Sequence, residues 1–180
     1  RLGETVELIM SDGQVLAYDH VVLACHSDQA LSLLGDASLA ERHALKAIPY
    51  QQNEVILHTD ASLLPRRRIA WSSWNYLLRE RFQERAILTY NMNILQGIKS
   101  DSTFCVTLNQ TDLIDESKIL RKFNYAHPVF NEASMQAQLK RTLISGKRHT
   151  YFAGAYWYNG FHEDGVRSAV DVCNQFGISL

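Results

Sequence analysis

The five consecutive apolar residues at positions 21–25, VVLAC, constrain the fold of this chain more than any other stretch. A strand exposed on one face alternates apolar and polar residues, whereas an uninterrupted apolar run predicts a strand buried on both faces, as in a parallel sheet. Residues 150–154, TYFAG, form a second short strand near the other end. The turn and capping residues predict a helix after each strand, over 27–35 and 163–176. Both ends of the chain therefore have an α/β pattern.

The middle of the chain favours antiparallel strands instead. Residues 54–59, 68–78, 86–94 and 103–109 are rich in β-branched and aromatic residues, and residues 122–130 form a weaker candidate because of Pro128. The sequence thus predicts a mixed α/β and α+β fold. Residues 1–40 and 149–180 form one α/β part, and it brackets an antiparallel insert at 41–148.

Apolar faces are expected on two helices and on the segment with the tryptophans. A helix capped by Asn131 and ending at Gly146 carries an apolar row, as does the last helix. Large rings are too frequent in residues 71–76 for an exposed strand, so most of them are expected in the core. The residues concerned are Met135, Leu139 and Leu143, then Val166, Ala169, Val170 and Cys173, and finally Trp71, Trp74 and Tyr76.

Composition narrows the function classes. The 180 residues are 46% hydrophobic and 21% charged with a net charge of −1, which fits a globular protein and does not suggest a general nucleic-acid binder. No apolar run is long enough for a membrane span. The three cysteines lie far apart and are interpreted as reduced thiols of a cytoplasmic protein. The histidines show no metal-ligand spacing, so no metal is expected.

The turn between residue 154 and residue 165 is the best candidate for a binding site. A helix N-terminus offers free N–H groups and a partial positive charge. Gly165 lies in the first turn of the last helix, where a missing side chain lets a ligand approach the backbone. Gly154 and Gly160 permit unusual backbone angles, and the neighbouring aromatic residues can pack against a planar ring. These features suit a flat, anionic cofactor, although strand, glycine loop and capped helix also occur in many α/β proteins without one.

Two segments carry a family resemblance. The stretch YFAGAYWYNGFHEDGVRSAVDVC, from residue 151, resembles the closing FAD-binding motif of the flavin-containing amine oxidase superfamily. The stretch YDHVVLACHSDQALSLL, from residue 18, resembles another late segment of that superfamily's FAD domain. The middle segments LHTDASLLPRRRIAWSSWNY, TYNMNILQGI and FNYAHPVF are similar to one branch, the bacterial predicted NAD/FAD-binding oxidoreductases.

The resemblance implies a role for each part of the chain. Residues 1–40 and 149–180 would be part of an FAD-binding domain, and residues 41–148 a substrate-binding domain. The family's Gly-x-Gly-x-x-Gly loop is absent, which implies that the chain is the C-terminal part of a longer flavoprotein and that FAD is absent from this part alone. The substrate would be an amine, or an acyl or isoprenoid chain.

The resemblance also assigns site residues. Phe161 would be one wall of an aromatic cage facing the substrate, with Trp157 as a second substrate contact. The residues assigned to the cofactor are Gly154, Ala155, Gly160, His162, Glu163, Asp164 and Gly165.

Two departures from the family weaken the amine assignment. Amine oxidases of this type often have an acid two positions after the glycine that ends the strand, where this chain has Tyr156. They also carry a lysine in the substrate domain, and YQQNEVILHTD has no counterpart. Catalytic residues therefore stay unassigned. The alternative is a non-catalytic binding or interaction module in which the turn is structural. Open strand edges on 21–25 and 150–154 predict self-association.

Other residue groups have competing explanations. Adjacent residues such as Cys25 and His26 face opposite ways on a strand, so a shape role is favoured over a nucleophile and base. The run Arg66, Arg67 and Arg68 could bind an anionic group, but a solvated turn is the favoured interpretation.

Overall fold

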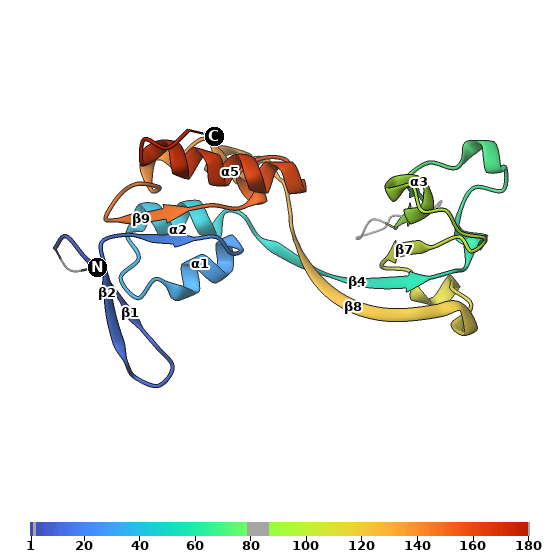
Figure 1. Cartoon of the computed structure of the whole chain (residues 1–180), viewed down its shortest axis with the longest axis horizontal. Coiled ribbons are helices and arrows are strands. Elements are labelled where there is room, and N and C mark those ends of the chain that lie inside the picture. The colour runs from blue at the N-terminus through green and yellow to red at the C-terminus, as the bar shows by residue number, and fades with distance from the viewer. Residues whose placement is uncertain (2, 79–86, 180) are drawn as a thin grey trace. The chain divides into compact units, whose positions relative to one another are not determined.

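The computed structural model describes residue 1, residues 3–78 and residues 87–179 (Figure 1). The chain forms two compact units, the first made of Arg1–Gln51 and Pro128–Leu180 and the second of Gln52–His127. The fold is mixed, with a small parallel sheet in the first unit and a five-stranded sheet based on the second. This confirms the predicted fold class. The sequence places domain boundaries after residues 40 and 148. In the structure, residues 41–51 and 128–148 also belong to the first unit.

The first unit contains a hairpin, a parallel strand pair and four helices. Its elements are β1 (Val6–Ile9), β2 (Val15–Tyr18), β3 (Val21–Leu23), α1 (Ser27–Leu33), α2 (Leu39–Lys46), α4 (Glu132–Gln138), β9 (Thr150–Phe152) and α5 (His162–Gln175). The hairpin turns at Asp12-Gly13, a dipeptide that favours such turns, and α2 starts at Ser38 with a capping box completed by Glu41.

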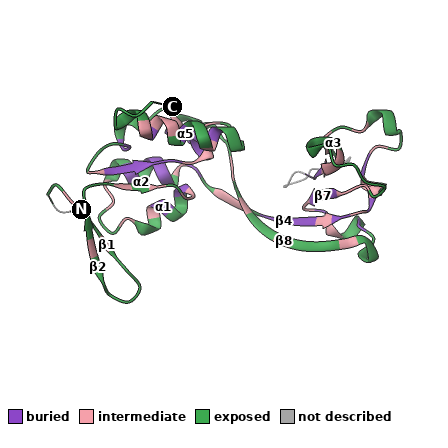
Figure 2. Ribbon diagram, viewed as in Figure 1, coloured by how far each residue is buried: buried purple, intermediate pink, exposed green. Residues whose placement is uncertain are grey.

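Helices cover both faces of β9. The strand pairs in parallel with β3, Val21 opposite Thr150 and Leu23 opposite Phe152. Phe152 belongs to the core cluster shared with α1, α2 and α4, whereas the two residues on either side of it pack with Val172 of α5. Strand β9 is therefore buried, as Figure 2 shows.

The prediction that residues 21–25 are buried on both faces is wrong for β3. Val22 is 47% exposed, and the two strands that precede β3, β1 and β2, are mostly exposed. The parallel pairing itself is confirmed. Within the described residues, β3 has a neighbouring strand on one edge alone, so there is little to cover an apolar run that a parallel sheet would normally bury.

Neither predicted helix face is buried as expected. Helix α4 ends at Gln138, and its apolar row is exposed: Met135 60%, Leu139 76% and Leu143 63%. In α5 the buried positions are Asp164, Ser168 and Val172. This face is selected by hydrogen bonds to the preceding strand and loop, while the expected row at Val166, Ala169, Val170 and Cys173 is exposed or half-buried.

The second unit is built around an antiparallel sheet. Strand order is β5-β6-β7-β4-β8, and the pairs β5–β6, β6–β7 and β7–β4 are antiparallel. Its elements are β4 (Tyr50–His58), β5 (Trp74–Tyr76), β6 (Leu88–Asn91), α3 (Met92–Gln96), β7 (Cys105–Leu108) and β8 (Ile119–Pro128). Both β4 and β8 extend across the boundary between the units. The segment 122–130, predicted as a weak strand, lies largely in β8, which has 10 residues.

The sequence misplaced parts of two strands. Residues 68–70 form a 3-10 turn, so the strand expected over 68–78 shrinks to β5. Residues 92–96 form helix α3 instead of continuing the strand, because the Asn91 side chain accepts from the Ile94 N–H and Gly97 ends the helix in a left-handed conformation. The tryptophan segment is also less buried than predicted, with Trp74 44% and Tyr76 64% exposed. Within the described residues, no helix is long and apolar enough to cross a membrane.

Candidate functional site

The turn between β9 and α5 is held together by hydrogen bonds from the chain itself. The Gly154 N–H donates to Ser168 Oγ at 2.8 Å, and Ser168 Oγ donates to the Gly165 carbonyl at 2.7 Å. The Ala155 carbonyl accepts from the N–H groups of Tyr158 and Gly160. The Gly154 amide and the Ala155 carbonyl, both assigned to the cofactor by the resemblance, therefore already have partners inside the first unit.

Two of the three glycines of the turn are explained by internal packing. A Cβ added at Gly154 would lie 2.3 Å from Tyr156 Cε1, so the ring of Tyr156 occupies the space that a side chain would need. A Cβ added at Gly160, where φ is +89°, would lie 3.0 Å from Phe130 Cε2. Both positions need glycine even without a ligand.

Gly165 differs from these two glycines. A Cβ at this position would have no heavy atom within 4 Å, outside its own helix and immediate neighbours. Glycine in a helix interior lowers helix stability by roughly 1 kcal/mol relative to alanine. The packing around Gly165 does not require glycine, because a Cβ there would meet no such atom. Among the glycines of the turn, Gly165 is the position at which open space is left for another group.

The first turn of α5 presents two unengaged amides. The N–H groups of Asp164 and Gly165 both donate to the Phe161 carbonyl, at 3.0 and 3.2 Å. No partner is recorded within the described residues for the N–H groups of His162 and Glu163, whose side chains are exposed. These two amides and the bare backbone of Gly165 lie within one helical turn, at the positive end of the helix dipole.

The acidic residues of this turn limit which ligand group can bind there. Asp164 is buried, and its carboxylate accepts from the N–H groups of Phe161 at 3.0 Å and Asn159 at 3.2 Å. Glu163 is exposed one position earlier. Their negative charges offset the dipole, so the site suits the neutral polar edge of a ring better than a phosphate.

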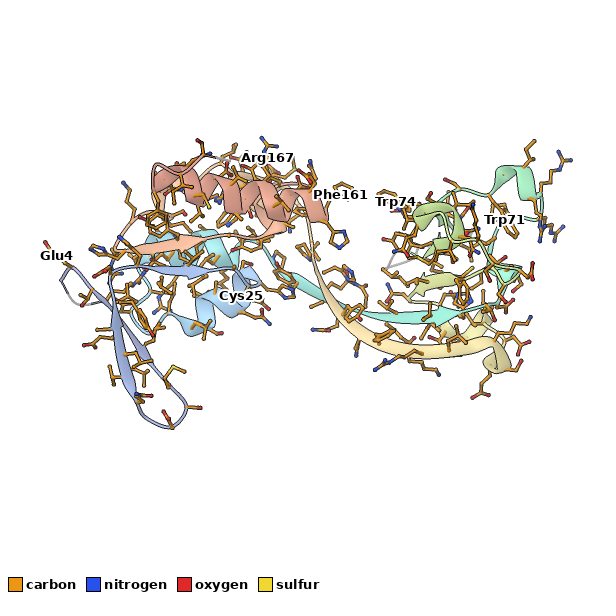
Figure 3. The ribbon with its side chains drawn as sticks, in the orientation of Figure 1. Glu4, Cys25, Trp71, Trp74, Phe161 and Arg167 are labelled. Atoms are coloured by element: carbon orange, nitrogen blue, oxygen red, sulfur yellow. The ribbon has the colours of Figure 1, made fainter. Side chains whose placement is uncertain are left out.

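The two aromatic residues assigned to substrate lie in different environments. Trp157 is 3% exposed, belongs to the core cluster and lies 4.9 Å from the ring of Tyr156. Phe161 is 52% exposed and precedes α5, where Figure 3 shows it at the start of the helix. Of these two side chains, Phe161 is the more exposed. Their roles in binding a substrate stay predictions.

A partly buried ion pair beside this turn was missed by the sequence reasoning. Arg141 is 9% exposed; its Nη1 lies 2.6 Å from Asp171 Oδ2, and its Nη2 donates to the carbonyls of Phe152 and Ser168. Tyr158 also donates to Asp171, at 2.5 Å. Arg141 thus links η5 (Arg141–Leu143), β9 and α5. An arginine five residues before the glycine that ends a predicted helix was the available signal, but its partners are set by the tertiary fold.

This cluster borders a hollow of about 300 Å³. Burial, followed by the hydrogen bond to Asp171, raises the pKa of Tyr158. Within the described residues, the Tyr156 hydroxyl and the Trp157 N–H have no hydrogen-bond partner of acceptable geometry. Because every hydrogen bond recorded for Arg141 ends on the chain itself, we interpret the ion pair as a structural link.

The carboxyl end of β3 lies next to that of β9 in the same parallel pair. Burial, followed by the charge of Asp28, raises the pKa of Cys25, which disfavours the thiolate that a nucleophile needs. His26 stacks on Tyr50 with ring centroids 4.2 Å apart. These contacts agree with the prediction that Cys25 and His26 shape the end of the strand. Open α/β sheets bind their ligands at this end of the strands.

The remaining candidates show no convergence on a site. Arg66, Arg67 and Arg68 are exposed, and Arg68 lies 5.2 Å from the centre of the Trp71 ring, as expected of a solvated turn. In the part of the chain that the structure covers, no group of three or more His, Cys, Asp or Glu residues could hold a metal ion.

Solved structures resemble this chain although their sequences have diverged. No family model and no curated protein matches it. A fatty acid isomerase from P. acnes, described as producing CLA, is similar with a TM-score of 0.66 and 17% identity over 99% of this chain and 46% of that one. A putative protoporphyrinogen oxidase from Exiguobacterium sp. 255-15 has a TM-score of 0.58 and 14% identity, over 98% of this chain and 44% of that one. The chain spans less than half the length of both proteins, and the likeness shows the fold.

Proposed function

We propose that this chain is part of an FAD-dependent oxidoreductase of the amine oxidase superfamily. The main support is the first turn of α5, where the amides of His162 and Glu163, unpaired within the described residues, lie beside Gly165, a position at which the packing would also accept a side chain. The turn follows a parallel strand, in a fold that covers nearly half of a fatty acid isomerase and a putative protoporphyrinogen oxidase. The FAD assignment itself comes from the sequence resemblance.

The described residues fit part of this cofactor. The amides of His162 and Glu163 and the open backbone at Gly165 would hold the polar edge of the flavin ring. Gly154, Ala155 and Gly160 fit less well, because their space or their polar groups are already used. The Gly-rich loop that would bind the pyrophosphate is absent from the sequence.

The chemistry would be removal of hydride from a C–N or C–C bond, with FAD, when bound, supplying the hydride acceptor. This chain would contribute positioning and exclusion of water. Phe161, exposed before α5, would lie against the substrate. Asp164 would keep the turn in shape through its two backbone hydrogen bonds. No residue of the described chain is assigned a proton-transfer role.

A non-catalytic module remains the alternative function. It is favoured by the internal explanations for Gly154 and Gly160, which account for most of the turn without a ligand. In that case the glycine at position 165 would be inherited from an ancestral protein and would bind no ligand.

The complete reading frame that contains this chain provides the test. We expect the purified protein to carry FAD, seen by its visible absorbance and released by denaturation. Gly165→Leu fills the open space and should reduce the bound FAD about tenfold. Circular dichroism should show that the variant keeps its fold. Gly35→Leu is the matched control, since it also has no neighbour within 4 Å and lies away from the turn. A colourless complete protein, or equal loss in both variants, would remove the proposal.

A further inference from the structure

The five-stranded sheet has two chemically different faces. Residues paired across antiparallel strands share a face, and so do alternate residues along one strand. One face is mostly polar, and the other is apolar and aromatic. The polar face carries His58, Cys105, Asn91, Ile56, Thr107, Thr89 and Asn75, and the apolar face carries Leu57, Val106, Tyr90, Trp74, Val55, Leu108, Leu88 and Tyr76.

The polar face is closed by its own hydrogen bonds. The Asp60 N–H donates to His58 Nδ1 at 3.1 Å, so the ring proton lies on Nε2, 2.8 Å from Thr107 Oγ1. Thr107 and Thr89 are joined by a further 2.8 Å hydrogen bond. All these side chains are almost fully buried. The polar groups have partners, and this face is packed inside the unit.

The apolar face is the more open one. Leu57, Val106 and Tyr90 form a row across neighbouring strands and are all half-buried. An antiparallel sheet with one face packed normally turns its apolar residues inward and its polar residues to water. Here the polar face is buried, and the apolar face is accessible at the Leu57, Val106 and Tyr90 row, while Val55 and Leu88 of the same face are buried. Accessible apolar surface of this kind marks an interaction site in soluble domains.

The row ends in a hollow of about 250 Å³ between the sheet and α3. Its lining is Leu57, Met92, Gln96, Ile98, Phe104 and Val106. Gln96 is the sole polar side chain in that set, and none of the six is charged. Among the neighbouring strand residues, His58 and Cys105 belong to the buried opposite face, and the uncharged Tyr90 phenol is the titratable group of the row.

We propose that this hollow and the adjoining row bind an uncharged alkyl or isoprenoid chain. A volume of about 250 Å³ is slightly below the usual 300–1,000 Å³ range of ligand pockets, so it would hold part of a chain whose remainder lies along the row. An ammonium group would lose its hydration here without gaining a carboxylate. That this chain belongs to the substrate rests on the proposed function, and the site favours the acyl or isoprenoid alternative over the amine.

The test is titration of the 180-residue chain with alcohols and an amine of matched length, observed on the methyl signals of Leu57, Ile98 and Val106. We expect saturable shifts of these signals with 1-decanol, and about fourfold tighter binding for each methylene added from 1-octanol to 1-decanol. Decylammonium should bind at least tenfold more weakly than 1-decanol.

Two variants locate the site. Val106→Thr keeps the side-chain shape but replaces a methyl group by a hydroxyl, and Ile98→Ser removes part of the wall at a position that is 37% exposed. Each should weaken 1-decanol binding about threefold or more. Val15→Thr is the matched control, because Val15 is an exposed strand valine of the other unit. It should leave binding unchanged.

Several results would overturn the inference: shifts confined to other residues, variants that bind as the parent does, or decylammonium binding more tightly than 1-decanol. Dimerisation in sedimentation that Val106→Thr abolishes would also overturn it, because the face would then cover a second copy. The flavin content of the complete protein is read separately. If the complete protein binds flavin but the chain does not bind the alcohols, the inference about this site is contradicted and the proposed function is not. If the chain binds the alcohols but the complete protein carries no flavin, the proposed function is contradicted and the inference about the site is not.

Discussion

At the scale of single residues, the same side chain can serve a predicted purpose or a different one depending on its neighbours. Gly154 was assigned to a cofactor by the family resemblance, but its missing side chain makes room for Tyr156. Gly165 was assigned to the cofactor in the same way, and no internal contact accounts for it. Sequence reasoning could not separate these cases, since the atom that competes for the space comes from the folded turn.

His58 gives a prediction at this scale. Burial lowers its pKa despite the charge of nearby Asp60, and protonation would place a second N–H against the Asp60 amide. Because the folded-state pKa lies below the unfolded value of about 6.5, the unfolded chain binds the proton first. The neutral ring therefore stabilises the fold above that pH. This contribution to the free energy of unfolding should decline as the pH falls below about 6.5, and level off below the folded pKa.

Urea denaturation at a series of pH values measures this dependence. His58→Gln should lower the stability at pH 8 and remove the component that declines below about 6.5. His43→Gln, at an exposed position on α2, serves as the control and should retain that component. An unchanged pH dependence in His58→Gln would show that another group causes it. Asp60, whose pKa is lowered to about 2 by the amides of Asp115 and Ser62 in spite of burial, titrates well below this window.

At the scale of elements, two side-chain capping signals mark the starts of their helices, whereas the predicted apolar faces are not the buried ones. Ser38 with Glu41 and Asn131 with Ser134 start their helices through bonds within four residues. The buried face of α5 instead follows from long-range contacts. Ser168 joins the end of β9 to the helix, and this requires the face with Asp164 and Val172 to turn inward.

Ser168→Ala tests this link. The Gly154 N–H would lose its acceptor, and an unsatisfied buried donor costs about 1–3 kcal/mol. We expect a loss of that order in the free energy of unfolding, measured by chemical denaturation. Ser32→Ala removes a comparable hydroxyl bond at an exposed position on α1 and should cost less than about 0.5 kcal/mol. Equal effects would mean that the bond to Gly154 does not position α5.

At the scale of the whole molecule, the chain exposes surface that parallel sheets usually bury. In the pairing of β3 with β9, Val21 and Leu23 bond toward β9, so the backbone groups of Val22 point to the opposite edge. A hollow of about 630 Å³ with mostly apolar lining lies beside β3, and includes Val21, Leu23, Leu33 and Leu34. The two solved structures of similar fold are more than twice as long, and we expect self-association of the isolated chain at this edge.

Val22→Lys tests the expected self-association. A lysine on an edge strand opposes pairing with another chain, so the weight-average mass in sedimentation equilibrium should fall toward 20.5 kDa. Val166→Lys places the same charge at an exposed position on α5 and should leave the mass unchanged. A parent chain that is already monomeric, with rapid hydrogen exchange at β3, would contradict the prediction.

The sequence by itself determined the local features of this protein: the hairpin at Asp12-Gly13, the capped helices, the strand type at each end and the antiparallel middle. These depend on backbone angles and on neighbours within a few residues. The tertiary structure alone decided which faces are buried, that Tyr156 fills the space at Gly154, that Arg141 pairs with Asp171, and that the sheet of the second unit buries its polar side. Burial and pairing depend on which segments meet in space, and the periodicity of one segment carries no information about its partner.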